Sequence, residues 1–272
     1  MIGFVLDLRS ASRGGAVVPA RLTLPSPTLD TLQRCTDIAF LVHGFNVDRA
    51  DGTVELEAFG TQLTALGPGA AVAVLWPGDS IVGPLSYPFE TSKADDSAVE
   101  LATFIGDYLP QQPRISFVGH SLGCRVVMET VRQLWIKNIP VAQVCLMAAA
   151  IDNDSLAIPG EYRDTTQNVA RIGVLYSPCD TVLEYAYPIG TLLSDFVHWT
   201  SSGDAALGYT GPRSSGTHLT PADVQGVGIP AAAHANHGDY LPSAAGQSNA
   251  LQTSAARFAN AVLAGTTPLL YA

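Results

Sequence analysis

The chain has 272 residues, of which 47% are hydrophobic and 14% are charged, a balance that excludes disorder along its whole length and suits one large domain. Its formal net charge of −10 at pH 7 disfavours binding to nucleic acid and to anionic membrane surfaces. The longest apolar runs, at 38–42 and 141–151, are too short to span a membrane. We therefore expect a small-molecule substrate, neutral or apolar, and no membrane span.

The four cysteines show neither C-x-x-C spacing nor a disulfide framework pattern, which is typical of reduced packing residues. The N-terminus lacks a basic region followed by a long apolar one. Both observations predict a cytoplasmic protein. The cysteines are Cys35, Cys124, Cys145 and Cys179.

Taken in order, β-rich apolar runs alternate with stretches of helical periodicity. The first two runs flank a turn and predict an antiparallel pair, and the later β-α-β alternation predicts a mostly parallel sheet with helices on both faces. We expect residues 1–272 to form a single α/β domain. Strands are predicted at 2–8, 17–24, 38–42, 71–76, 114–118, 141–149 and 170–176, and helices near 54–66, 91–109, 123–137 and 255–263.

The stretch 114–137 combines a short buried strand, a five-residue turn and an amphipathic helix. The turn at 119–123 reads G-H-S-L-G and matches G-x-S-x-G in the strand-turn-helix context that this pattern requires. A serine at the tip of so sharp a turn has a strained backbone, and the flanking glycines leave it room. The pattern predicts Ser121 as a nucleophile and the Leu122 N–H as an oxyanion donor. The alternative is a connection whose serine only caps the helix.

This arrangement resembles the alpha/beta-hydrolase superfamily. The strand 38–42 ends in H-G-F-N at 43–46, which is similar to the superfamily's oxyanion loop and implies that the Phe45 N–H is the second oxyanion donor. With W-P-G at 76–78 and an Ala- and Asp-rich helix before the elbow, the chain resembles a bacterial hydrolase family known as domain of unknown function 900, from about residue 36 to residue 183. The resemblance implies an alpha/beta-hydrolase fold.

A serine nucleophile needs a histidine base, and the base needs an acid to orient it. In the superfamily these residues follow one another as serine, acid and histidine. Asp180, in a rigid S-P-C-D-T turn, is the preferred acid, and Asp152, after the preceding strand, is the alternative. The loop just before the last helix, where the superfamily keeps its catalytic histidine, contains two histidines. His237 is the preferred base because glycine follows it and its H-G-D-Y run at 237–240 resembles the family's pattern. His234 in the same loop is the alternative.

Helical and strand periodicity fades at 185–230, where glycine, proline and aromatic residues are interspersed. We interpret this segment as a lid inserted before the catalytic histidine. An irregular surface excursion is the alternative.

Together these features predict a serine hydrolase that cleaves a carboxylic ester through an acyl-enzyme, and the aromatic lid favours an apolar acyl group. One alternative is a non-catalytic protein that uses the same scaffold to bind a ligand or partner. Another is an acyltransferase or amidase with the same triad. No cluster has metal-ligand spacing and no phosphate-binding glycine motif occurs, so neither a metal nor a cofactor is expected.

Overall fold

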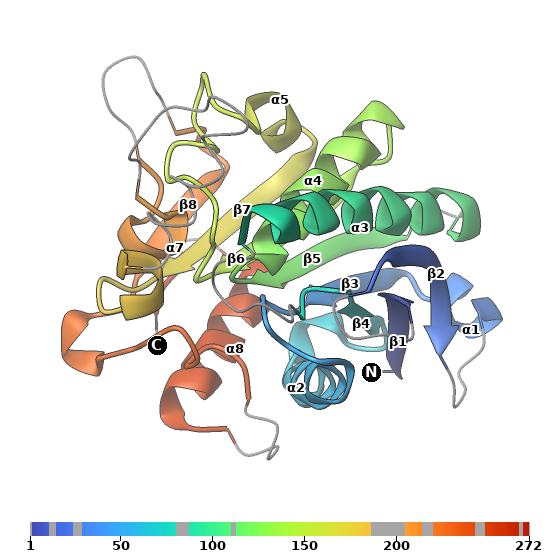
Figure 1. The fold of residues 1–272 in the computed structure, drawn as a ribbon, viewed down its shortest axis with the longest axis horizontal. Helices are drawn as coiled ribbons and strands as arrows, with labels where there is room; N and C mark the ends of the chain where they lie inside the picture. The colour runs from blue at the N-terminus through green and yellow to red at the C-terminus, as the bar shows by residue number, and fades with distance from the viewer. Residues whose placement is uncertain are drawn as a thin grey trace.

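The computed structural model describes most of the chain, and Figure 1 shows its arrangement. In the described part, eight strands form one sheet in the order β2-β1-β4-β3-β5-β6-β7-β8. The described residues are 2–10, 15–23, 29–79, 87–109, 113–185, 205–213, 220–242, 248–266 and 269–271. The strands are β1 (Ile2–Arg9), β2 (Val17–Thr23), β3 (Asp37–Val42), β4 (Ala70–Leu75), β5 (Arg114–His120), β6 (Val141–Met147), β7 (Val169–Tyr176) and β8 (Val224–Gly228).

The sheet is parallel except for the β1–β2 pair, which is antiparallel as the sequence predicts. Its central strands read as continuous apolar runs because helices cover both of their faces, and β4 is buried at every position. In a parallel sheet the carboxyl ends of all strands meet at one edge, where ligands bind in folds of this kind. The loops after β1, β3, β4, β5, β6, β7 and β8 therefore all lie at this edge.

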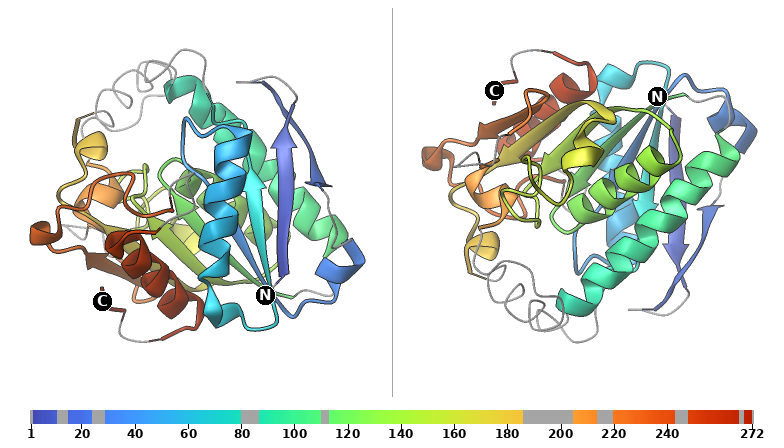
Figure 2. Two further views of the ribbon diagram at one scale, coloured as in Figure 1. Left: turned by 90° about the horizontal axis from the view of Figure 1, so that it is seen from below. Right: turned by 90° about the horizontal axis from the view of Figure 1, so that it is seen from above.

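Helices α2 and α8 cover one face of the sheet, and α3 and α4 cover the other (Figure 2). Asp48 caps α2 by accepting from the N–H groups of Ala50 and Asp51, and Asn249 and Gln252 form a capping box at the start of α8. The helices are α1 (Leu29–Gln33), α2 (Arg49–Thr61), α3 (Tyr87–Tyr108), α4 (Gly123–Ile136), α5 (Arg163–Thr166), α7 (Leu207–Thr210) and α8 (Ala250–Leu263), with short 3₁₀ turns η1 (Thr64–Leu66) and η3 (Ala231–Ala233).

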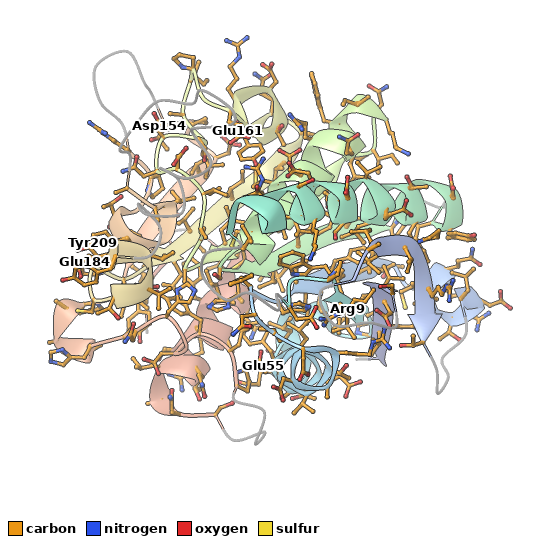
Figure 3. All side chains as sticks on the ribbon, in the orientation of Figure 1. Arg9, Glu55, Asp154, Glu161, Glu184 and Tyr209 are labelled. Carbon is orange, nitrogen blue, oxygen red and sulfur yellow. The ribbon has the colours of Figure 1, made fainter. Side chains whose placement is uncertain are left out.

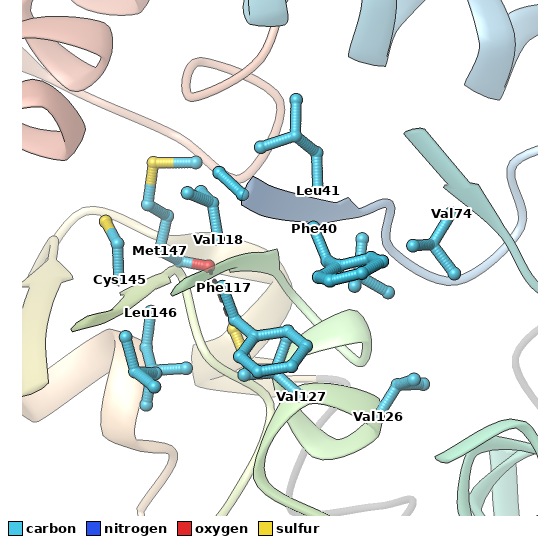
Figure 4. Close-up of a cluster of buried hydrophobic side chains, with 14 of the residues drawn as sticks. Phe40, Leu41, Val74, Phe117, Val118, Val126, Val127, Cys145, Leu146 and Met147 are labelled. Atoms are coloured by element: carbon cyan, nitrogen blue, oxygen red, sulfur yellow. Dashed lines mark hydrogen bonds between the residues drawn. The ribbon is translucent and has the colours of Figure 1, made fainter. Parts of the chain in front are cut away.

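The core lies between the central strands and these helices. Phe40 on β3 and Phe117 on β5 are fully buried and stack with their ring centroids 5.5 Å apart, and Val126 and Val127 of α4 lie close by (Figure 4). Burial of each such side chain contributes about 1.5–3 kcal/mol. This packing holds β5 and α4, and with them the turn that joins them, in a fixed position.

The segment 185–230, predicted to be a lid, is partly built into the fold. Val224–Gly228 forms β8, the last strand of the sheet, so the lid prediction is wrong for these residues. Helix α7 packs against β7, and the Gly208 N–H donates to the carbonyl of Ala149, just after β6, at 2.9 Å. The remaining parts of the predicted lid, 186–204 and 214–219, lie outside the described residues.

Candidate active site

Ser121 occupies the turn between β5 and α4 in a left-handed conformation, with φ 55°. A non-glycine residue rarely adopts this conformation, and the surroundings hold it there. The Ser121 N–H donates to the Met147 carbonyl at 3.0 Å, and its own carbonyl accepts from Ala150 N–H at 3.1 Å. Gly123 permits the close packing of this turn, because a Cβ at that position would lie 2.3 Å from the His43 carbonyl oxygen.

Ser121, His237 and Asp180 form a continuous chain of hydrogen bonds. The Ser121 Oγ lies 2.8 Å from the His237 Nε2, and the His237 Nδ1 lies 2.7 Å from the Asp180 Oδ2. The Asp180 carboxylate is fully buried, and its Oδ1 accepts from the Leu183 N–H at 3.0 Å. An ionised carboxylate only accepts, so Nδ1 carries the proton and Nε2 is free to accept one from serine.

Side-chain hydrogen bonds of Ser177 and Asn236 join the loop of Asp180 to the loop of His237. The buried Ser177 hydroxyl donates to the Ala235 carbonyl at 2.6 Å and accepts from the Cys179 N–H at 3.1 Å. The Asn236 side-chain oxygen accepts from the His237 N–H at 2.8 Å and from the Thr181 hydroxyl at 3.1 Å. These bonds set the spacing between the acid and the base.

The backbone of residues 43–47, called the oxyanion loop after the role that the sequence predicts for it, passes directly against Ser121. A Cβ on Gly44 would lie 3.0 Å from the Ser121 Cβ, so only glycine fits there without displacement. Phe45 follows, and its side chain packs against the core. Across from it, Leu122 precedes α4, where the first N–H groups of a helix have no acceptor within the helix. Ser121 thus lies between the loop that contains Phe45 and the start of α4.

Two further histidines support the site without acting as bases. His120 is half-buried, its Nε2 donates to the His237 carbonyl at 2.9 Å, and desolvation lowers its pKa to about 3. His43 accepts from the Trp76 N–H through Nε2 at 3.3 Å, and burial lowers its pKa to about 4. Groups with pKa values this low are poor proton acceptors at neutral pH. Both side chains therefore act as neutral hydrogen-bonding groups.

Residues 29–193, more than half of the chain, match a family described as alpha/beta hydrolase of unknown function (DUF900). The chain belongs to this family. The match confirms the resemblance seen in the sequence, and the mostly parallel sheet confirms the predicted alpha/beta-hydrolase fold.

Solved structures similar to this DUF900 protein include a putative hydrolase from Agrobacterium vitis, at 13% identity over 74% of this chain and 81% of that chain, with a TM-score of 0.39. Another is a metagenomic carboxyl esterase, at 15% identity over 85% and 73% of the two chains, with a TM-score of 0.36. A lipase-esterase related protein from Clostridium acetobutylicum is 14% identical over 53% and 76%, with a TM-score of 0.32. No curated protein matches. These similarities are too distant to carry an argument about the substrate.

The sequence leaves two candidate acids and two candidate histidines, and the structure places the members of each pair differently. Asp180 contacts His237, whereas Asp152 pairs with Ala206 in an isolated β-bridge. His237 contacts Ser121, whereas His234 is exposed at the end of η3, with φ 50°. Ser177 was missed by the sequence reasoning, although it occupies the same S-P-C-D-T turn as Asp180.

A cavity of about 410 Å³ lies away from these residues, between α2 and the strands β1, β3 and β4, and is lined by residues such as Gly3, Gly60 and Ala71. None of its lining residues belongs to the loops of Ser121, Asp180 or His237.

Within the described ranges, no group of three or more His, Cys, Asp or Glu side chains is arranged to hold a metal ion. No described helix combines the length and the apolar character of a membrane span.

Proposed function

We propose that this DUF900 protein is a serine hydrolase that cleaves a carboxylic ester through an acyl-enzyme. The observation that carries the proposal is the chain of short contacts from the Ser121 Oγ to His237, 2.8 Å, and from His237 to the buried Asp180, 2.7 Å. This is the geometry of an activated nucleophile with an oriented base.

In the first half of the reaction, His237 removes the proton of Ser121 as the Oγ attacks the ester carbonyl carbon. The N–H groups of Leu122 and Phe45 stabilise the negative charge on the carbonyl oxygen. Asp180 holds the imidazole in the required tautomer and stabilises the imidazolium that forms. The tetrahedral intermediate then collapses, and His237 gives its proton to the departing alcohol.

In the second half, water enters and His237 removes one of its protons, so that the hydroxide adds to the acyl carbon. The same two amides stabilise the second tetrahedral intermediate. Its collapse releases the carboxylic acid and returns the proton to Ser121. The chain's net charge of −10 repels anionic substrates, which favours a neutral ester with an apolar acyl group.

The direct test is covalent labelling by a fluorophosphonate, followed by turnover of p-nitrophenyl esters of increasing chain length. Wild type should be labelled, Ser121→Ala should not, and His237→Ala should be labelled far more slowly. His234→Ala is the matched control, because His234 lies in the same loop but is exposed, and it should behave as wild type. Absence of labelling in folded wild type would refute the proposal and favour a ligand-binding role.

A further inference from the structure

A buried ion pair lies behind the oxyanion loop. Arg9 is the last residue of β1 and is labelled in Figure 3, and Asp79 follows β4. Their side chains are only 3% and 6% exposed, and the Arg9 Nη2 contacts the Asp79 Oδ1 directly. The other branch of the guanidinium, Nη1, donates to the Val47 carbonyl at 3.2 Å. Arg9 thus connects the end of the oxyanion loop to the carboxyl edge of the sheet.

A second carboxylate and a second arginine fix the backbone of Arg9. The Asp7 Oδ1 accepts from the Arg9 N–H at 3.0 Å, and the Asp7 Oδ2 pairs with Arg49 at 2.8 Å. Arg49 in turn donates to the Arg9 carbonyl at 3.3 Å. The position of the guanidinium is therefore set by several bonds that do not involve the oxyanion loop itself.

Burying an ion pair is a poor way to gain stability, because the cost of removing two charges from water offsets their attraction. Well-packed apolar residues of similar volume often serve stability equally well. The buried Arg9–Asp79 pair is therefore better explained by the backbone carbonyl of Val47 that Arg9 binds. Arginine suits this position because its planar fork can bind a carboxylate and a carbonyl at once.

The oxyanion loop needs such support, because Asn46 has φ 59°, a conformation that a non-glycine residue rarely adopts unaided. Its bonds come from neighbouring strand ends: the Asn46 N–H donates to the Gly78 carbonyl at 2.7 Å, and the Trp76 indole N–H donates to the His43 carbonyl at 2.8 Å. Arg9 supplies the corresponding anchor at Val47. Phe45 lies between these anchored residues.

We propose that Arg9 is a positioning residue that holds the oxyanion loop through the Val47 carbonyl, with Asp79 as its counter-ion. Arg9 does not touch the substrate. It keeps the Phe45 N–H where the tetrahedral oxyanion forms, so its contribution appears in the transition state and not in substrate binding. This inference rests on the proposed hydrolase function and assigns it a residue outside the triad.

The test compares two ketones on the Ser121 enzyme. With a trifluoromethyl ketone, the Ser121 Oγ adds to the carbonyl carbon, its proton passes to His237, and the carbonyl oxygen becomes an anion that needs the oxyanion donors. The corresponding methyl ketone binds without this step. The ratio of the two affinities measures the oxyanion site, and the rate of fluorophosphonate labelling measures it independently.

The decisive variants are Arg9→Lys and the double variant Arg9→Met/Asp79→Leu. Lysine keeps the charge but not the fork, and the double variant leaves no unpaired buried charge. We expect both to label about tenfold to a hundredfold more slowly and to lose a similar factor in affinity for the trifluoromethyl ketone, because a displacement of about 1 Å can cost a hundredfold. Affinity for the methyl ketone should not change.

The control is Arg132→Met/Glu129→Leu, which removes an ion pair on α4 whose carboxylate is equally buried, 2% exposed. It should leave the ratio of affinities unchanged. A wild-type ratio in Arg9→Lys would overturn the proposal, and this variant decides the question if the double variant does not fold. Failure of wild-type Ser121 to react at all would instead refute the hydrolase function, and with it this inference.

Discussion

Replacing Ser177 with alanine should loosen the contact between the loops that carry Asp180 and His237. Ser177 is 1% exposed, and its hydroxyl bonds both to the Ala235 carbonyl and to the Cys179 N–H. Alanine fits the same space but removes both bonds. The Ala235 carbonyl then remains buried without its partner.

Each hydrogen bond contributes about 1 kcal/mol, and leaving a buried acceptor unsatisfied adds to the loss, so the free energy of unfolding should fall by about 2–3 kcal/mol. In urea this corresponds to a midpoint lower by about 1 M with an unchanged slope. Turnover of a p-nitrophenyl ester should fall by about tenfold, because small displacements of a catalytic group are costly.

Ser97→Ala is the matched control. Ser97 is fully buried on α3, and within the described part of the chain its hydroxyl has no hydrogen-bond partner. Removing it forfeits no bond, so stability should change by less than about 1 kcal/mol and turnover should stay at the wild-type level. Equal effects of the two substitutions on stability and turnover would refute the assignment of Ser177 as a link between the two loops.

Three further predictions concern the site. Asp180→Asn should lower kcat by about 10³–10⁴-fold by disturbing the His237 tautomer, and a loss below tenfold in ester turnover would contradict its role. Gly123→Ala should destabilise the fold and abolish labelling, since its Cβ would meet the His43 carbonyl oxygen at 2.3 Å, and urea unfolding together with fluorophosphonate reaction checks this. Burial lowers the pKa of His120 from 6.5 to about 3, so its contribution to stability is present above pH 6.5 and is lost as the pH falls towards 3. His120→Gln, which keeps a donor for the His237 carbonyl, should therefore lose less stability between pH 7 and 5 in urea titrations, and an unchanged pH dependence would count against it.

The sequence by itself determined the parts of the site that local chemistry dictates. The turn at 119–123 is recognisable because a buried strand, two glycines, a serine and a helix follow one another without interruption. The strand, the glycines, the serine and the helix all favour the same strand-turn-helix structure, so few other local structures are compatible with this stretch. The alternation of strands and helices likewise predicts the parallel sheet and the edge at which its loops gather.

Other features of the fold depend on contacts that local periodicity does not encode. Val224–Gly228 pairs with β7 as a strand although two of its five residues are glycine, so its own sequence is a weak strand signal. Arg9 and Val47 are 38 residues apart, and they meet because β1 and β3 flank β4 in parallel, so that both strands end at the same edge of the sheet.

Only the tertiary structure decided which acid and which histidine lie together. Asp180 and His237 are 57 residues apart, and His237 is 116 residues from Ser121. Asp152 and His234 satisfy the same order along the chain, so order alone leaves both alternatives open. The physical reason is that Asp180 and His237 meet where the loops after β7 and β8 pack together, and that packing depends on the whole sheet.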